Sequence, residues 1–332
     1  MQVRASAPTR IDLAGGTLDI WPLYLFHPGA QTVNAAIGQR AACTVSTSPD
    51  RRVQIVSEDT AAALCADTWR QLATDGDNRL LAHIVRFFEV DGVRVATRAA
   101  SPLGAGIAGS SALNVAVCAA LAEWCRVDFP PEELLTLAMN LEARTLGIPT
   151  GVQDYRPARY GGIAAVELGP AGVRRVPLDV DPAGLERRIV LAYSGDSRSS
   201  GINNWEITRR HIEGDSTVVA HLGRIAEIAA ATRDALTRHD WTSLARQVTL
   251  EWRERQALAP GVTTPAIDRL FAAATAAGAT AGKVCGAGGG GCVFFLVDPD
   301  RRDAVRAALT SAGARLLDSP IDLDGLRVER LD

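Results

Sequence analysis

Two glycine-rich segments constrain the fold of this chain most, because both match the pattern G-x-G-x-x-G. They occupy residues 104–109 and 286–291. In a dinucleotide-binding fold this pattern joins a strand to a helix, and an acidic residue ends the next strand about 20 residues later. Here Glu123 falls inside the helix expected after the first segment, Asp128 falls in a loop, and a strand is expected after the second segment. These observations argue against a dinucleotide-binding fold.

The first segment has the composition of a phosphate-binding loop, although a tight turn is the alternative interpretation of either segment. Glycines let backbone N–H groups approach an anion closely, and Ser110 and Ser111 add hydroxyls at the positive end of a helix. A Walker A loop is excluded. This loop has a glycine six residues before its lysine and a serine or threonine directly after it. Lys283 is the only lysine of the chain, and Ala277 and Val284 occupy these two positions. A protein kinase is excluded because no lysine occurs in the first 200 residues.

The composition is that of an ordinary globular chain, with 332 residues, 47% hydrophobic and 22% charged. A net charge of -3 gives no general attraction to nucleic acid or to an anionic membrane. No apolar run approaches the roughly 18 residues of a membrane span, and the first residues lack the pattern of a signal peptide. We therefore expect a cytoplasmic protein with a small-molecule substrate. The six cysteines and five histidines form no zinc-binding pattern.

Hydrophobic periodicity predicts an α+β chain. Strands are expected over residues 3–7, 32–46, 53–56, 93–98, 161–168, 189–193 and 291–297, with short strands near the end. Helices are expected over residues 79–90, 110–125, 130–146, 216–238, 241–258, 265–277 and 301–311. A loop is expected over residues 147–160 and a domain boundary near residue 185.

Four segments resemble the motifs of the GHMP kinases, the family of galactokinase, homoserine kinase, mevalonate kinase and phosphomevalonate kinase. They are APTRIDLAGGTLD at 7–19, PLGAGIAGSSA at 102–112, the stretch from 142 through GIPTGVQD at 147–154, and KVCGAGGGGC at 283–292. The resemblance implies a GHMP kinase fold. A ribosomal protein S5 domain 2-like N-terminal domain with a left-handed β-α-β unit would span residues 1–185, and a ferredoxin-like C-terminal domain residues 186–332. ATP and the acceptor alcohol would meet between them.

The resemblance implies that ATP binds the first glycine segment and that Mg²⁺ is required. The ATP-binding residues would be Pro102, Gly104, Ala105, Gly106, Ile107, Ala108, Gly109, Ser110 and Ser111. The Ser111 hydroxyl and the Glu142 carboxylate would hold Mg²⁺, which prefers hard oxygen ligands. A helix cap at Ser111 and a solvated helix carboxylate at Glu142 are the alternative interpretations.

Asp154 and Arg10 are the catalytic residues that the resemblance implies. Asp154 would accept the proton of the acceptor hydroxyl as this hydroxyl attacks the γ-phosphorus. Arg10 would lie beside Asp154, keep it ionised and offset charge on the transferred phosphoryl group. Some members of the family are argued to work without a general base, and a turn-capping aspartate is the alternative interpretation of Asp154.

The resemblance also indicates which residues bind the acceptor. These are Gly16, Thr17, Asp19, Arg198, Gly288 and Gly289. Asp19 corresponds to the aspartate that binds sugar hydroxyls in galactokinase-like members, and an ordinary loop aspartate is the alternative. Asp12 is assigned no role in the site, because bonding within the N-terminal loop is an equally good interpretation.

Within the family, the chain is similar to bacterial D-glycero-D-manno-heptose 7-phosphate kinases and, in its N-terminal motif, to L-fucokinases. Both phosphorylate an anomeric hydroxyl, so we expect transfer to the C1 hydroxyl of a sugar or sugar phosphate. Val152 stands where the heptose kinases have lysine, which removes a cation near the acceptor. Arg198 is either its replacement or a surface residue. An unphosphorylated sugar and a mevalonate- or homoserine-type alcohol remain alternatives.

Two other functional classes have less support. A hydrolase with Ser197 as nucleophile lacks the following glycine of a nucleophile elbow, and no histidine is assigned to it. A non-catalytic sensor would have lost metal or base residues, whereas Ser111, Glu142 and Asp154 are all present. The sequence therefore predicts an ATP- and Mg²⁺-dependent small-molecule kinase, acting as a monomer or homodimer.

Overall fold

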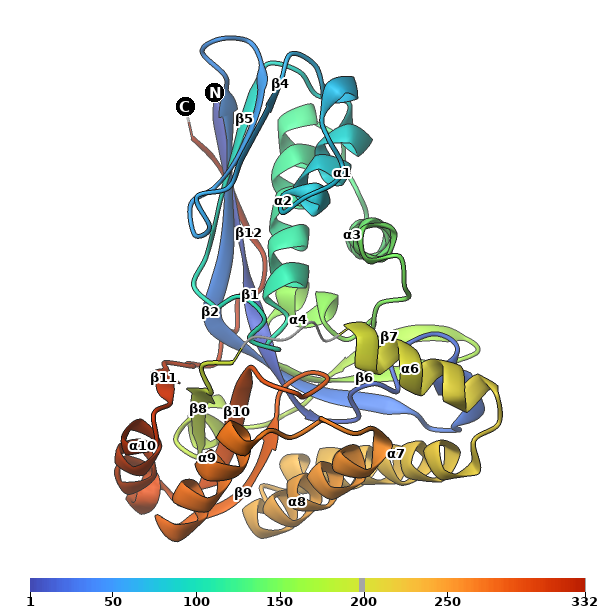
Figure 1. Cartoon of the computed structure of the whole chain (residues 1–332), viewed down its shortest axis with the longest axis vertical. Helices are drawn as coiled ribbons and strands as arrows, with labels where there is room; N and C mark the ends of the chain where they lie inside the picture. The colour runs from blue at the N-terminus through green and yellow to red at the C-terminus, as the bar shows by residue number, and fades with distance from the viewer. Residues whose placement is uncertain (197–200, 332) are drawn as a thin grey trace.

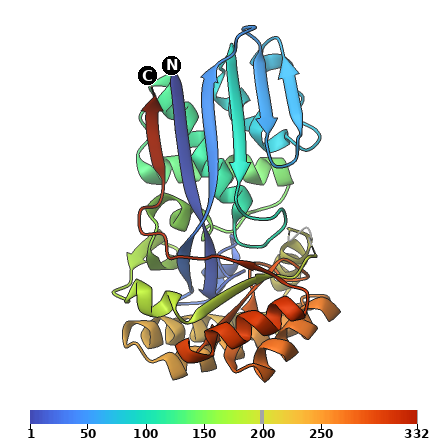
Figure 2. The ribbon, with the colours of Figure 1, turned by 90° about the vertical axis from the view of Figure 1, so that its left-hand side faces the viewer.

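The computed structural model describes residues 1–196 and 201–331, and its larger sheet has eight strands. Six follow one another in the order β12-β1-β2-β5-β3-β4, while β6 pairs with β2 and β7 with β6. The strands are β1 (Gln2–Ala14), β2 (Gln31–Thr47), β3 (Val53–Ser57), β4 (Ala63–Ala66), β5 (Val93–Ala99), β6 (Ile163–Gly169), β7 (Gly172–Pro177) and β12 (Arg327–Leu331). Figure 2 shows the C-terminal strand β12 beside the N-terminal strand β1.

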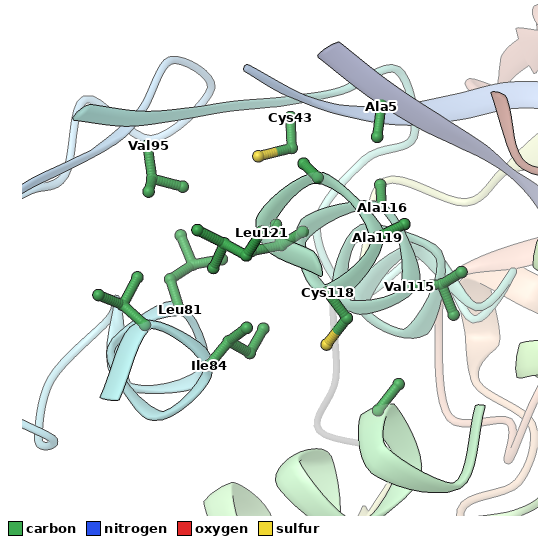
Figure 3. Packing of buried hydrophobic residues seen from close by; sticks show 14 of the residues in the cluster. Ala5, Cys43, Leu81, Ile84, Val95, Val115, Ala116, Cys118, Ala119 and Leu121 are labelled. Atoms are coloured by element: carbon green, nitrogen blue, oxygen red, sulfur yellow. The ribbon is translucent and has the colours of Figure 1, made fainter. Parts of the chain in front are cut away.

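Helices cover one face of the upper part of this sheet (Figure 1). They are α1 (Arg79–Phe88), α2 (Gly109–Cys125) and α3 (Pro131–Leu146). Small residues of α2 let it pack closely on the strands, and Figure 3 shows Ala116 and Ala119 beneath Ala5 and Cys43. Because α2 begins with the two serines, this packing fixes the position of the loop before it.

The lower halves of β1 and β2 are covered on both faces. In β1, residues 2–6 alternate between buried and more exposed positions, but every residue from 7 to 14 is buried. In β2, residues 31–37 are all buried and the later residues alternate. The lower halves pack against the helices α7 (Ser216–Thr237) and α8 (Trp241–Leu258). Charged side chains on this part of β1 are therefore held away from water.

The smaller sheet has four antiparallel strands in the order β11-β8-β10-β9. They are β8 (Ile189–Tyr193), β9 (Ala279–Val284), β10 (Cys292–Val297) and β11 (Arg315–Leu317). Alternate residues of β10 point to opposite faces: Val293 and Phe295 cluster with residues of α9 (Pro265–Ala276) and α10 (Arg302–Ser311). Phe294 and Leu296 cluster instead with residues of α7 and α8. Every residue of β10 is buried, as expected for a strand between two helical layers.

The remaining elements are short or lie between the sheets. They are the helices α4 (Tyr155–Tyr160), α5 (Pro182–Glu186) and α6 (Gly201–Ile212), and the 3-10 helices η1 (Leu23–Phe26), η2 (Trp69–Gln71) and η3 (Pro299–Arg301). Among the described residues, no helix has both the length and the apolar character of a membrane span.

The predicted strands and helices are confirmed to within a few residues, except that the strand predicted over residues 3–7 continues to residue 14 as β1. The loop predicted over residues 147–160 is wrong in its last part, where residues 155–160 form α4. Arg156 and Pro157 interrupt any apolar pattern of helical spacing, so no helix was predicted there. In the structure residues 155–158 are nevertheless buried. The helix α6 and the strand β7 were not predicted. The division near residue 185 stays a prediction, and β12 crosses it by pairing with β1.

Candidate active site

The two glycine segments lie against each other between the sheets, and we call residues 102–111 the phosphate loop and residues 286–291 the second glycine loop. The Cys292 N–H donates to the Ala105 carbonyl over 2.7 Å. Gly106 has a φ of +74°, and a Cβ there would lie 2.6 Å from the Cys285 carbonyl oxygen. A Cβ at Gly286 would lie 2.9 Å from the Gly106 carbonyl oxygen. Both positions therefore require glycine, and the second loop supports the first.

The backbone of the phosphate loop is shaped to hold an anion. Positive φ values occur at Gly104, Gly106 and Ala108, whereas the residues between them lack positive φ. Such alternation turns successive N–H groups toward one concave side. Among residues 1–196 and 201–331, no acceptor receives a hydrogen bond from the N–H groups of residues 106–111. These groups end at the N-terminus of α2, so the loop fits a phosphate group of ATP.

The structure brings together Arg10 of β1 and Asp154, the residue before α4. The Arg10 Nε and Nη2 atoms donate to one Asp154 oxygen, Oδ1, over 2.9 and 2.6 Å. Arg10 is 3% exposed and Asp154 is 26% exposed, so the carboxylate lies at the accessible end of the pair. The other oxygen, Oδ2, accepts no hydrogen bond from the described residues. Arg10 Nη1 also donates to the Gly106 carbonyl over 3.0 Å, which ties the pair to the phosphate loop.

A cluster of oxygen atoms lies at the start of α2. The Ser110 and Ser111 hydroxyls donate to the two Glu142 oxygens over 2.8 and 2.9 Å, and the Tyr155 hydroxyl donates to Glu142 over 2.7 Å. Burial raises the pKa of Glu142, although these hydrogen bonds act in the opposite direction. Within the described residues, no three His, Cys, Asp or Glu side chains gather as a metal site. One carboxylate with serine hydroxyls fits Mg²⁺ whose other ligands are phosphate oxygens and water.

Asp19 is buried and lies close enough to Asp154 and Arg10 for their charges to act on it. Its carboxylate accepts hydrogen bonds from the backbone N–H of Gln153 over 3.0 Å and from its side-chain amide over 3.2 Å. A Cβ at Gly151 would lie 2.1 Å from Asp19 Oδ2, so this contact depends on glycine. Burial and then the negative charge of Asp154 raise the pKa of Asp19 to about 7. The carboxyl is thus poised to change its charge near neutral pH.

The other residues predicted to bind the acceptor make contacts with α6 and with Val262. The Thr17 hydroxyl lies 3.3 Å from the Asn204 side-chain oxygen on α6. Gly288 and Gly289 pack on Val262, whose carbonyl accepts the Gly289 N–H over 2.7 Å. Arg198 lies outside the described residues. Binding of the acceptor by these residues stays a prediction.

A buried ionic network lies beneath the N-terminal motif and was not predicted from the sequence. The Lys283 ammonium donates to Asp12 Oδ2 over 2.9 Å and to Glu251 Oε1 over 2.6 Å, and all three side chains are 0% exposed. Burial alone would raise the pKa of Asp12, but Lys283 and Arg10 outweigh it and hold this pKa at about 2. The network joins β1, α8 and β9, so it connects both sheets.

Arg255 extends the same network to the two motif loops. Its guanidinium donates to the Gly16 carbonyl over 2.9 Å and to the Gly286 carbonyl over 2.6 Å. Glu251, one turn earlier on α8, accepts the Gly15 N–H over 2.9 Å. The spacing of four residues on a predicted helix would have placed these two charges on one face. Their partners Gly15 and Gly16, 236 and 239 residues away in the chain, had no local signal.

Comparison with known proteins identifies the family of this chain. Residues 78–162 match the GHMP kinases N terminal domain, and residues 232–315 match the GHMP kinases C terminal family. The chain is 29% identical to D-glycero-alpha-D-manno-heptose 7-phosphate kinase of Campylobacter jejuni, over 99% of each chain. It is 25% identical to mevalonate kinase of Thermococcus sibiricus, again over 99% of each.

Kinases of known structure share the fold of this chain. A D-glycero-D-manno-heptose 1-phosphate kinase from Bacteroides thetaiotaomicron superposes with a TM-score of 0.81 at 26% identity, over 99% of each chain. Galactokinase of Lactococcus lactis has a TM-score of 0.80 over 98% of this chain and 95% of its own; at 19% identity it shows the fold alone. Fold and site define a phosphotransferase. The chain belongs to the GHMP kinase family, and the predicted GHMP kinase fold is confirmed.

Proposed function

We propose that this enzyme transfers the γ-phosphoryl group of ATP to a hydroxyl of a sugar or sugar phosphate, in a Mg²⁺-dependent reaction. The observation that carries the proposal is the Arg10–Asp154 pair, which is hydrogen-bonded to the phosphate loop and has one free carboxylate oxygen. The pair combines a cation for the transferred group with an acceptor for the hydroxyl proton. The heptose 7-phosphate kinase relative supports a sugar-type acceptor.

The free N–H groups of the phosphate loop would hold the phosphates of ATP, with Ser111 and Glu142 as the residues that hold Mg²⁺. Bound Mg²⁺ would supply charge neutralisation at the phosphates. The acceptor oxygen forms a bond to the γ-phosphorus while the bond from this phosphorus to the bridging oxygen of ADP breaks. The hydroxyl proton moves to Asp154 Oδ2. Arg10 keeps Asp154 ionised and in position for this step.

The anomeric C1 hydroxyl is the acceptor position that we propose, because the chain resembles anomeric sugar kinases. An unphosphorylated sugar is the second candidate, and a specific observation favours it. Near Asp19, the described cations Arg10 and Arg156 are already engaged, by Asp154 and Glu132 respectively. Val152 adds no charge. Because the chain is also similar to mevalonate kinases, a non-sugar alcohol is a third candidate for the acceptor.

An assay of ADP release tests the proposal. The acceptors are D-glycero-D-manno-heptose 7-phosphate, L-fucose, galactose, mannose, glucuronate, mevalonate and homoserine, each measured with and without Mg²⁺. Turnover on one sugar, lost without Mg²⁺ and in the Asp154→Asn variant, is the expected result. Turnover on mevalonate or homoserine alone would refute a sugar acceptor. The position of the new phosphate, read by ³¹P and ¹³C NMR, tests the C1 assignment.

Replacing Glu142 by glutamine is expected to raise the Mg²⁺ concentration needed for half-maximal activity about tenfold or more. The amide keeps the shape of the side chain but removes the one carboxylate of the oxygen cluster. The measurement is a Mg²⁺ titration of the initial rate at saturating ATP. Glu133→Gln, an exposed change at the start of α3, is the control. An unchanged Mg²⁺ requirement would contradict the role of Glu142.

The raised pKa of Asp19 predicts a pH dependence of acceptor use. Because this pKa is about 7, the carboxyl is mostly protonated below pH 7 and ionised above it. An ionised carboxylate accepts stronger hydrogen bonds from sugar hydroxyls. We therefore expect kcat/KM for the acceptor to rise as the pH increases through about 7, and to lose this step in Asp19→Asn. If Asp19→Asn showed the same rise in kcat/KM near pH 7, a group other than Asp19 would be responsible for it.

A further inference from the structure

A cavity lies on the C-terminal half of the molecule, between one face of α8 and the ends of the strands of the smaller sheet. Its volume is about 470 Å³, which lies in the range that holds small organic ligands. The lining residues used here are Arg188, Trp241, Arg246, Leu250, Arg253 and Asp298. None of its lining residues belongs to either glycine loop or to the Arg10–Asp154 pair. The cavity is therefore separate from the phosphoryl-transfer site.

The cavity concentrates positive charge that forms no ion pair with the part of the chain that the structure describes. Three arginines line it against one carboxylate, Asp298. Neither Arg246 nor Arg253 makes an ion pair or a side-chain hydrogen bond with any of residues 1–196 or 204–331. Some other arginines of this half do form ion pairs; Arg209 and Arg224, for example, pair with glutamates. The lining thus carries a net charge of about +2 in a protein whose own net charge is -3.

Apolar groups stand beside these cations. The Arg188 guanidinium lies 4.5 Å from the centroid of the Trp241 ring and donates to the Gly184 carbonyl over 2.9 Å, so it forms a fixed wall. Its Nε atom is buried without a hydrogen-bond partner in the described part of the chain. Leu250 is 37% exposed and lies on α8 between Arg246 and Arg253. A ligand here would meet cations and an apolar surface together.

We propose that this cavity binds a small organic phosphate. Its dianionic group matches the net charge of the lining, and its organic body packs against Trp241 and Leu250. Arg246 and Arg253 are seven residues apart on α8, about 10 Å along the axis, so they flank the cavity on one helix face. Guanidinium groups are well suited to this task because they bind phosphate oxygens through two parallel hydrogen bonds.

Calorimetric titration with phenyl phosphate, in the presence of saturating ADP and Mg²⁺, tests the proposal. ADP occupies the phosphate loop, so the heat reports on sites elsewhere. We expect binding to the wild type, binding about tenfold or more weaker in the Arg246→Ala/Arg253→Ala double variant, and unchanged binding in the control Arg269→Ala. Arg269 is an exposed arginine of α9 outside the cavity. Inorganic phosphate should bind more weakly than phenyl phosphate, because it lacks the organic body.

Three results would overturn the proposal. No binding at millimolar phenyl phosphate would show that the cavity is not a phosphate site. Equal affinity of the wild type and the double variant would place the ligand elsewhere. An equal loss in Arg269→Ala would show attraction to surface charge in general. Because Arg246 and Arg253 are exposed and form no ion pair with the described residues, their removal should leave the thermal midpoint unchanged, which keeps loss of binding separate from loss of folding.

Discussion

The Asp154→Asn variant is expected to lose about 10²- to 10⁴-fold in kcat, the usual contribution of a positioned general base. Asparagine keeps the shape of the side chain, and its oxygen can still accept hydrogen bonds from Arg10. It cannot accept the proton of the acceptor hydroxyl. Since ATP would contact the phosphate loop rather than Asp154, KM for ATP should change little. Steady-state kinetics with both substrates varied separates these effects.

The control is Asp300→Asn, which removes an exposed carboxylate far from the site and should leave kcat unchanged. A second readout supports the assignment. The charge of Asp154 contributes to the raised pKa of Asp19, so the variant should shift the step in kcat/KM near pH 7 to a lower pH. A fall in kcat of less than about tenfold would contradict the role of Asp154 as the base and leave Arg10 and Mg²⁺ as the main contributors.

Local patterns predicted most of the fold elements. The helix α2 has an apolar period and begins at two serines, and β10 is a short apolar run after a glycine loop. Such features depend on neighbours in the chain, which the sequence shows directly. The order of the strands does not depend on neighbours: β12 pairs with β1 across more than 300 residues. Only the family resemblance indicated the topology.

The candidate site was likewise predicted only in part. The motifs located Arg10, Glu142 and Asp154, because the residue types and their spacing are characteristic of the family. Motifs gave no reason to connect Lys283 with Asp12 or Glu251, since buried ion pairs between distant segments leave no periodic signal. The cavity at α8 was also not predicted, because it arises where a helix face meets the ends of strands.

Replacing Lys283 by methionine is expected to lower the free energy of unfolding by about 3–5 kcal/mol. Methionine fills a similar volume but leaves the Asp12 and Glu251 carboxylates buried without their shared cation. The sign of the pH effect follows from the pKa of Asp12, which is about 2 in the folded protein and lies below its ordinary value. Stabilisation by this carboxylate is present above about pH 4 and is lost as the pH falls toward 2. The difference between wild type and variant should therefore shrink on acidification.

Urea unfolding followed by circular dichroism measures this difference, with Arg269→Ala as a control that removes an exposed cation. Adding Asp12→Asn and Glu251→Gln to Lys283→Met should restore part of the lost stability, because the buried charges that lack a partner are then gone. Activity should not return with it, since Asp12→Asn removes the negative charge that lies beside Arg10. Full recovery of kcat in the triple variant would mean that the network stabilises the fold without positioning the catalytic pair.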